Sequence, residues 1–257
     1  MIKTEMFDLT GKVALLTGAS KGMGLAMARG LAAHGAQVMI SSRKLDACDA
    51  AAGEINASLG ETRVHALACN AGRREDLEAL VEGTRAALGP ITVLVGNAGV
   101  NPHYGPMSEI PDAAYDKIMA TNVRSNHWLA HMVAPDMVGG GSMMFTASVG
   151  AYKPSLQLGT YGMSKLALIG LVRNLAQEYG PRGVRANAIC PGLIKTDFAR
   201  ALWESPEATR RVTEDIPLGR LGEAEDLAGL AVFLASDASA YISGQAMTVC
   251  GGSYMWT

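Results

Sequence analysis

Short apolar segments alternate with longer amphipathic segments along the whole 257-residue chain, and this order constrains the possible folds more than any other feature. The pattern predicts strands at residues 13–17, 37–41, 64–68, 91–95, 142–146, 185–189 and 246–249. It predicts helices at 22–33, 44–59, 74–88, 112–137, 160–179 and 223–234, and a largely polar helical segment at 195–215. The longest helix should bend near Pro135. Such alternation predicts an α/β protein with a doubly wound, seven-stranded parallel sheet, helices on both faces and right-handed crossovers, in a single domain spanning 1–257.

The composition agrees with a large core and excludes several kinds of partner. Hydrophobic residues make up 49% of the chain, charged residues 18%, and the net charge is −2. Without a basic excess we expect no nucleic-acid partner, and without an apolar stretch of about 18 residues we expect no membrane span. The four cysteines form no Cys-x-x-Cys pair, so we expect reduced thiols, no metal site and a cytoplasmic location.

Glycine-rich and polar segments follow several of the predicted strands. They are the loop that begins at Gly18, Ser42–Arg43, Asn97-Ala98-Gly99, Ser148 and Pro191-Gly192. Because doubly wound sheets bind ligands outside the carboxyl ends of their strands, we expect these segments to share one site.

The first of these segments reads Thr17-Gly18-Ala19-Ser20-Lys21-Gly22-Met23-Gly24 and joins the first strand to the first helix. Glycines permit a tight turn and a close approach of the backbone to a ligand. The helix N-terminus that follows supplies free N–H groups for a pyrophosphate. The spacing is Gly-x-x-x-Gly-x-Gly, and at a first strand–helix turn it indicates a dinucleotide site of the Rossmann type.

The end of the second strand indicates which dinucleotide is preferred. An NAD site usually has an acidic residue there, but this chain has Ser42 followed by Arg43 and Lys44. A 2′-phosphate suits the guanidinium of Arg43 and the ammonium of Lys21. We therefore expect NADP(H), with NAD(H) as the alternative.

Tyr161 and Lys165 are spaced i, i+4 and should share one helix face, with Ser148 a short way upstream. An ammonium beside a phenol favours the phenolate, so we expect Lys165 to lower the pKa of Tyr161. A tyrosine tuned in this way can give or take a proton, and the Ser148 hydroxyl can hold a substrate oxygen.

Together these motifs resemble the short-chain dehydrogenases/reductases over essentially the whole chain. The resemblance implies a catalytic tetrad of Asn122, Ser148, Tyr161 and Lys165, with hydride transfer to or from a nicotinamide and no metal. Tyr161 would be the acid or base, and Asn122 would position a water in a proton relay through a bend in the long helix. The implied cofactor-binding residues are Gly18, Ser20, Lys21, Gly22, Met23, Gly24, Ser42, Arg43, Asn70, Ala71, Asn97, Ala98, Gly99, Tyr161, Lys165, Pro191, Gly192, Ile194 and Thr196.

Two positions depart from the family pattern. Gly96 stands where the family's Asn-Asn-Ala-Gly segment has its first asparagine, and we expect only a structural effect. Asn70 stands where many relatives have an aspartate near the adenine, and its oxygen can still accept from the adenine amino group. Within the family, stretches such as Ser41-Ser42-Arg43-Lys44 and Arg220-Leu221-Gly222-Glu223 are most similar to the NADP(H)-dependent carbonyl reductase/retinol dehydrogenase group.

The expected substrate end is mostly apolar. Its candidate walls are Ser148, Val149, Tyr152, His103, Tyr104, Leu202 and Trp203, with residues 193–215 as a lid or, equally, an ordinary surface helix or oligomer contact. These walls favour a neutral, fairly apolar ketone or secondary alcohol.

The main alternative is a 3-oxoacyl-thioester reductase, which would need basic residues such as Arg124, Arg173, Arg200, Arg210 and Arg211 near the site. A non-catalytic nucleotide sensor on the same fold is a third possibility, against which the intact tetrad weighs. The resemblance also implies a homotetramer or dimer through helices 112–137 and 160–179.

Overall fold

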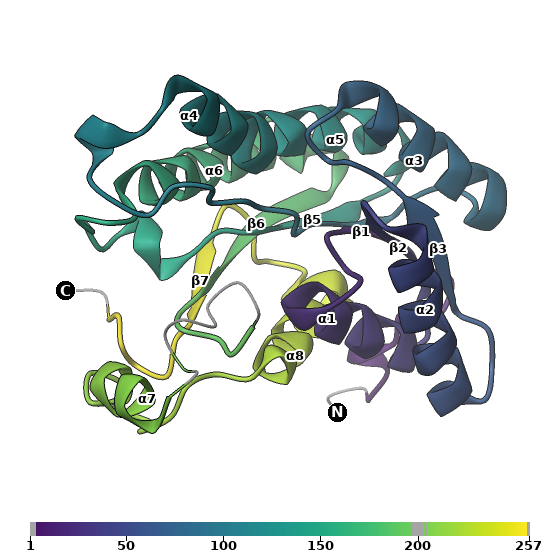
Figure 1. The fold of residues 1–257 in the computed structure, drawn as a ribbon. Helices are drawn as coiled ribbons and strands as arrows, with labels where there is room; N and C mark the ends of the chain where they lie inside the picture. The colour runs from purple at the N-terminus through teal and green to yellow at the C-terminus, as the bar shows by residue number, and fades with distance from the viewer. Residues whose placement is uncertain (1–3, 197–202, 204, 256–257) are drawn as a thin grey trace.

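Seven parallel strands form one sheet in the order β3-β2-β1-β4-β5-β6-β7 (Figure 1). The computed structural model describes residues 4–196, 203 and 205–255. The strands are β1 (Val13–Thr17), β2 (Gln37–Ser42), β3 (Val64–Ala68), β4 (Val93–Gly96), β5 (Gly141–Thr146), β6 (Val184–Pro191) and β7 (Ala246–Val249). The predicted fold class is confirmed. The strand order reverses between β1 and β4, which is where doubly wound sheets bind dinucleotides.

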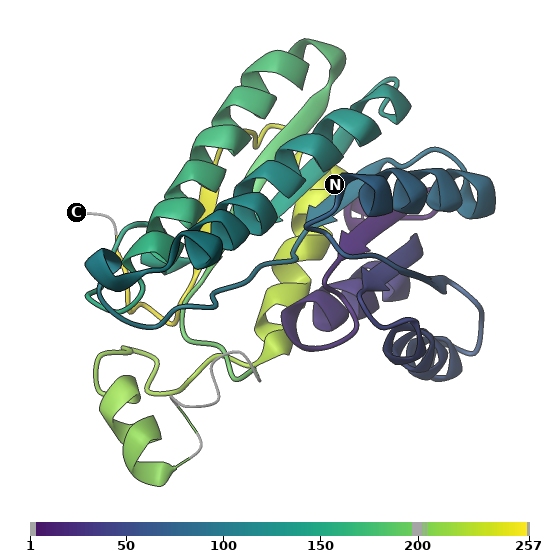
Figure 2. The same ribbon diagram turned by 45° about the horizontal axis from the view of Figure 1, so that its top comes forward.

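Helices cover both faces of this sheet (Figure 1). One face carries α1 (Gly22–Ala33), α2 (Leu45–Leu59) and α8 (Ala228–Ala235), and the other carries α3 (Arg74–Leu88), α4 (Asp112–Met119), α5 (Ser125–Val133) and α6 (Gly159–Tyr179). The helix α7 (Pro206–Thr213) lies apart from both layers in Figures 1 and 2. Short helical turns are η1 (Thr4–Phe7), η2 (Met107–Glu109), η3 (Ala120–Arg124), η4 (Ala134–Asp136), η5 (Val149–Ala151), η6 (Gly180–Arg182), η8 (Ala224–Leu227) and η9 (Asp237–Ser239). In the described ranges, no helix combines the length and the apolar character needed to span a membrane.

Alternate side chains of β1 enter two separate hydrophobic clusters. Ala14 and Leu16 belong to the cluster formed with α1, α2 and α8, whereas Val13 and Leu15 belong to the cluster formed with α3, α5 and α6. All five residues of β1 are buried, and burial of one leucine side chain contributes about 1.5–3 kcal/mol. The strand is therefore held from both faces, which fixes the end from which the glycine loop departs.

The segment predicted as one long helix is interrupted at Asn122, where the family resemblance implied a bend, and it ends near Pro135, where a bend was predicted. The helix α4 ends at Met119, a π-helical turn η3 covers Ala120–Arg124, and α5 ends at Val133 before Pro135 is reached. The 3₁₀ turn η4 then contains Pro135. Proline ends the helix here, whereas the irregularity inside it lies at Asn122, where π-turns commonly mark functional positions.

The segment after β6 is less helical than predicted. Within the described residues between 195 and 215, helix is confined to Pro206–Thr213. Ile194 and Gly222 form an isolated parallel bridge, with hydrogen bonds from Lys195 N to Gly222 O (2.8 Å) and from Gly222 N to Leu193 O (3.0 Å). The two ends of the segment between Ile194 and Gly222 are therefore held together. The predicted helix 223–234 is also corrected, because it begins as the 3₁₀ turn η8, capped by Glu223 and Asp226, before α8.

Candidate active site

The loop between β1 and α1 brings backbone atoms so close that side chains would not fit. A Cβ on Gly24 would lie 2.4 Å from the Gly18 carbonyl oxygen, and one on Gly18 would lie 2.9 Å from the Ala98 Cα. Gly18 also has φ of +64°, a conformation that glycine adopts without strain. The N-cap residue Lys21 makes no side-chain cap hydrogen bond to α1, so the helix N-terminus suits an anionic group.

Thr17 and Asn97 tie this loop to the neighbouring strands. The Thr17 hydroxyl oxygen accepts from the backbone N–H groups of Asn97 and Ala98, both at 3.2 Å. The Asn97 amide donates to the Gly18 carbonyl (2.8 Å), and its oxygen accepts from the Thr146 hydroxyl (3.0 Å). The ends of β1, β4 and β5 are therefore fixed as one unit around the turn.

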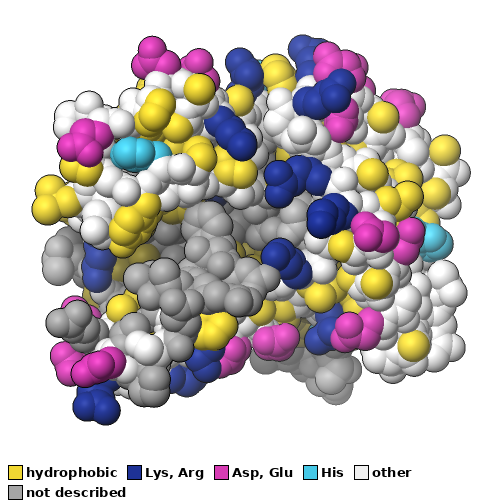
Figure 3. Space-filling view, in the orientation of Figure 1, with side chains coloured by type: hydrophobic (Ala, Val, Ile, Leu, Met, Phe, Trp, Pro, Cys, Tyr) yellow, Lys and Arg dark blue, Asp and Glu magenta, His cyan; other side chains and the backbone are white. Residues whose placement is uncertain are grey.

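The end of β2 carries basic groups instead of an acid. Arg43 is exposed, and none of the ion pairs among the described residues includes it. The neighbouring Ser42 hydroxyl lies 3.1 Å from the Cys48 thiol, which donates to it, and the Ser42 carbonyl accepts from Cys69 N at 2.8 Å. The hydrogen bond from Cys69 N to the Ser42 carbonyl places the next residue, Asn70, beside the end of β2. The Asn70 side-chain oxygen accepts from Gly72 N. Lys and Arg side chains gather over the area where β1, β2 and α1 meet (Figures 1 and 3).

Ser148, Tyr161 and Lys165 meet beyond the end of β5. Tyr161 and Lys165 lie in the first turns of α6, and the Lys165 nitrogen is 5.5 Å from the centre of the Tyr161 ring. The Lys165 side chain is buried and donates to the Thr146 carbonyl (2.7 Å). The Ser148 side chain is hydrogen-bonded to the Tyr161 phenol and also accepts from Gly150 N (3.0 Å).

Asn122 joins this group to the loop after β4. Its oxygen accepts from Val100 N (2.8 Å), and its amide donates to the Val100 carbonyl (3.0 Å) and to the Ser164 hydroxyl (3.0 Å). Ser164 in turn donates to the Tyr161 carbonyl (2.7 Å). Asn122 is fully buried, so the π-turn and the start of α6 are linked by a continuous set of buried polar contacts.

The electrostatics correct one expectation. Burial raises the pKa of Tyr161 to about 12, although the bond from Ser148 acts in the opposite direction. Burial also lowers the pKa of Lys165 to about 8. Burial therefore outweighs any lowering of the tyrosine pKa by the neighbouring lysine.

Comparison with known proteins decides the family. A family model described as "Enoyl-(Acyl carrier protein) reductase" matches residues 18–254. The chain is 40% identical over 252 residues to "Dehydrogenase/reductase SDR family member 4" of Oryctolagus cuniculus, covering 97% of this chain and 96% of that protein. The chain belongs to the short-chain dehydrogenase/reductase (SDR) family. The predicted resemblance is confirmed, and SDR proteins are oxidoreductases that act on CH–OH and C=O groups.

Two solved SDR structures have the same fold. A 7 alpha-hydroxysteroid dehydrogenase complexed with NADH and 7-oxo glycochenodeoxycholic acid has a TM-score of 0.93 and 35% identity, covering 98% of both chains. A blue fluorescent protein from a metagenomic library, in complex with NADPH, has a TM-score of 0.89 and 32% identity, covering 96% of this chain and 100% of the other. The neighbours of this SDR chain therefore include both NADH and NADPH complexes.

The structure brings most of the predicted SDR site residues together at the carboxyl edge of the sheet. Gly192 N bonds to Val249 O (2.9 Å), and Thr196 lies against the first helix, since a Cβ on Gly22 would be 3.4 Å from its methyl carbon. Three residues of this network had not been predicted as site residues: Thr17, Thr146 and Ser164. Ser164 lies inside the Tyr161–Lys165 run and could have been found by its position, but Lys165 donates to the backbone carbonyl of Thr146, which no side-chain pattern indicates.

The expected substrate walls occupy less uniform positions. Tyr104 is 61% exposed, and the His103 ring nitrogen lies 3.1 Å from the Pro106 carbonyl oxygen. The Tyr152 ring stacks on Tyr254 with centroids 5.0 Å apart, and burial raises the pKa of Tyr152 to about 12. The Trp203 indole donates to the Thr196 carbonyl (3.1 Å). Leu202, and Arg200 of the basic residues considered for a thioester substrate, lie outside the described residues.

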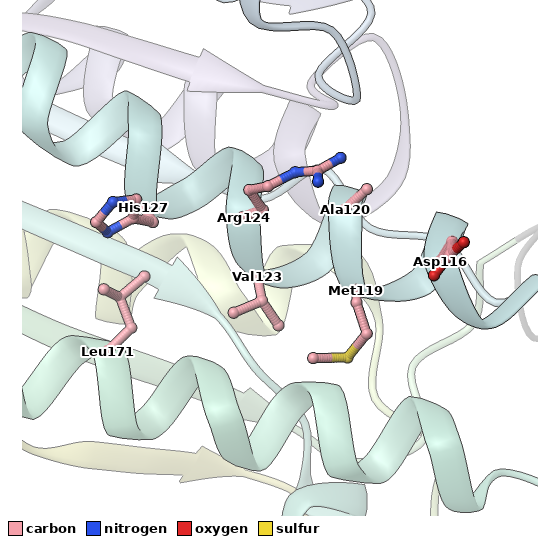
Figure 4. A pocket seen from close by; sticks show the side chains of 7 residues that line it. All are labelled: Asp116, Met119, Ala120, Val123, Arg124, His127 and Leu171. Carbon is pink, nitrogen blue, oxygen red and sulfur yellow. The ribbon is translucent and has the colours of Figure 1, made fainter.

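A separate groove of about 550 Å³ lies between the α4–α5 segment and α6, and none of its lining residues belongs to the predicted site (Figure 4). Met119, Val123 and Leu171 point into it from the two sides. Asp116 and Arg124 lie about two helical turns apart along its length.

Proposed function

We propose that this SDR protein transfers hydride between NADP(H) and a neutral, fairly apolar ketone or secondary alcohol. The observation that carries the proposal is the meeting of Ser148, Tyr161 and Lys165 at the carboxyl edge of the sheet, beside a glycine loop that excludes side chains. When bound, the dinucleotide supplies or takes up the hydride. The residues of this chain are left to bind the reactants and to move the proton.

We assign the proton step to Tyr161. In carbonyl reduction its phenol gives a proton to the substrate oxygen, and in alcohol oxidation its phenolate takes one. Ser148 is placed to hydrogen-bond the same oxygen as charge develops on it. Lys165 presents an ammonium near the phenol, on the side where the nicotinamide ribose would bind. Asn122 fixes the π-turn from which a proton relay would reach Lys165.

The preference for NADP(H) rests on the end of β2. Arg43 is exposed there with no carboxylate paired to it among the described residues, and no acidic residue stands at the strand end to repel a 2′-phosphate. A guanidinium binds phosphate through parallel hydrogen bonds. The solved neighbours in complex with NADH and with NADPH show that the fold accepts either cofactor. The side chains at the end of β2 therefore decide which cofactor this chain prefers.

We further propose a cytoplasmic location and a homo-oligomer built on a two-fold axis. The four cysteines are free thiols, as in proteins of reducing compartments. In the α4–α5 groove, Asp116 and Arg124 flank the apolar Met119, Ala120 and Val123. A two-fold axis near Ala120 would bring each Asp116 toward the partner's Arg124, which makes the surface self-complementary.

The 3-oxoacyl-thioester reductase is not proposed as a second function. Among the basic residues that it needs, Arg124 stacks on Trp128 with its guanidinium 5.0 Å from the ring centre, and Arg173 lies on α6 about two turns beyond Lys165. Arg173 lies near enough to the candidate wall residue Tyr152 to act against the rise of its pKa, but the described contacts do not gather a basic surface there.

A ketone panel tests the proposal. Purified protein is supplied with NADPH or NADH and a series of neutral ketones, a keto acid and an acetoacetyl thioester, and cofactor oxidation is followed at 340 nm. We expect turnover with NADPH and apolar ketones. Turnover of the thioester alone would replace the proposed substrate class, and cofactor binding without any turnover would indicate a nucleotide sensor.

A further inference from the structure

The side chain of Asn126 fills the space beside Gly96. Asn126 is 2% exposed, at the start of α5. An ideal Cβ on Gly96 would lie 2.2 Å from the Asn126 side-chain oxygen and 2.6 Å from a ring carbon of Phe145. The glycine at the end of β4 is therefore required by a buried amide that arrives from another element.

The same amide serves the π-turn. Asn126 Nδ2 donates to the Asn122 carbonyl (2.9 Å), and Ser125 Oγ donates to the Thr121 carbonyl (2.6 Å). In the turn η3 the backbone is wound more widely, with Ser125 N bonded to the Ala120 carbonyl. Two buried side chains thus supply hydrogen bonds to successive carbonyls of the turn, which favours the π geometry over a regular helix.

We infer that Asn126 is a positioning residue for the reaction, acting through Asn122. The inference rests on the proposed function. Holding the Asn122 carbonyl fixes the backbone from which the Asn122 amide reaches Val100 and Ser164, and Ser164 is bonded to the backbone of Tyr161. Loss of the Asn126 donor therefore loosens the π-turn and, through it, the placement of the catalytic tyrosine.

The matched pair of variants is Asn126→Ala and Asn174→Ala. Asn174 makes the same kind of bond, from its amide to the Gly170 carbonyl (2.8 Å), but on an exposed part of α6. Misplacing a reacting group by 1 Å costs roughly 100-fold in rate, so we expect Asn126→Ala to lower kcat by about tenfold or more. The dissociation constant for NADPH should stay within about twofold. Asn174→Ala should leave kcat unchanged.

The pH profile distinguishes positioning from a purely structural role. Because the tyrosine is held less firmly in Asn126→Ala, the plot of its alcohol-oxidation rate against pH should differ in shape from that of the unmutated protein. Asn126→Asp, which keeps the shape but replaces the donor by an acceptor facing the Asn122 carbonyl, should not rescue kcat. A lower melting temperature with unchanged kcat and unchanged pH profile would overturn the inference.

A thermodynamic cycle tests the pairing without any turnover. Gly96→Ala should lower the melting temperature more in the unmutated background than in the Asn126→Ala background, because the nearest clash is with the Asn126 oxygen. Equal losses in the two backgrounds would contradict the packing argument. If the unmutated protein oxidised no cofactor with any ketone, the proposed function would fail, whereas the cycle would still report on Gly96 and Asn126.

Discussion

At the scale of single residues, burial is the main cause of the pKa shifts of Lys165 and Tyr161. The lysine loses hydration and has a pKa of about 8, and its nitrogen is held by the Thr146 carbonyl. The tyrosine pKa is raised to about 12. At neutral pH these pKa values favour a protonated phenol and a lysine that still carries most of its charge, which is the state that the proposed carbonyl reduction requires.

These two pKa shifts predict opposite pH dependences for the two directions of the reaction. Alcohol oxidation needs the phenolate, so below the tyrosine pKa its kcat/KM should rise about tenfold for each pH unit. Reduction needs the phenol and the charged lysine, so its kcat/KM should be flat near pH 6 and fall as the pH passes the lysine pKa of about 8. Initial rates in both directions at saturating cofactor check this, and an oxidation rate that falls as the pH rises would contradict it.

Arg43 should set the cofactor preference. The change Arg43→Asp replaces the exposed cation at the end of β2 by a carboxylate, which repels a 2′-phosphate and accepts from ribose hydroxyls. We expect kcat/KM for NADPH to fall by about 100-fold or more, in line with roughly 3 kcal/mol for a charge-assisted bond, while that for NADH holds or rises. Lys12→Asp, at the opposite end of β1, is the matched control. A higher kcat/KM with NADH in the unmutated protein would sink the assignment.

At the scale of elements, the β1–α1 turn makes a sharp prediction. Gly24→Ala puts a methyl group 2.4 Å from one backbone atom and 2.8 Å from another, so the turn itself must move. Cofactor affinity should fall more than about tenfold. Gly53→Ala on α2 is the control, because nothing lies within 4 Å of its Cβ position, and it should stabilise the helix by up to about 1 kcal/mol. Calorimetric titration with NADPH measures both; equal affinities would contradict the steric argument.

The elements also show which parts of the fold and of the site could be predicted from the sequence. Strands such as β1, with four apolar residues and Thr17 all buried, and helices such as α3, with Leu77, Leu80, Val81 and Thr84 buried on one face, follow sequence patterns and were predicted to the residue. A bend at Asn122 was implied only by the family resemblance, because the π-turn there depends on hydrogen bonds from Ser125 and Asn126 that no periodicity encodes. The motif residues were predicted from their spacing, but their desolvation and the Thr146 carbonyl under Lys165 exist only in the folded chain.

At the scale of the whole molecule, the α4–α5 groove predicts a charge-dependent self-association. Arg124→Asp should weaken the oligomer, since it would set like charges against each other across the two-fold axis. Adding Asp116→Arg to the same chain restores opposite charges and should restore assembly. Sedimentation velocity at several concentrations reports the mass. If neither change alters the mass of the assembly, the interface lies elsewhere on the molecule.

The proposed function assigns the proton step to one phenol, that of Tyr161, and the most direct test is to remove its hydroxyl. Tyr161→Phe deletes a single hydroxyl whose partner is Ser148 and leaves the glycine loop and Lys165 in place. Turnover and NADPH binding are measured on the same preparation, with Tyr115→Phe, an exposed tyrosine on α4, as the control. We expect kcat to fall by at least about 100-fold, while the dissociation constant for NADPH changes by less than about threefold. Retention of most of the activity by Tyr161→Phe would contradict it.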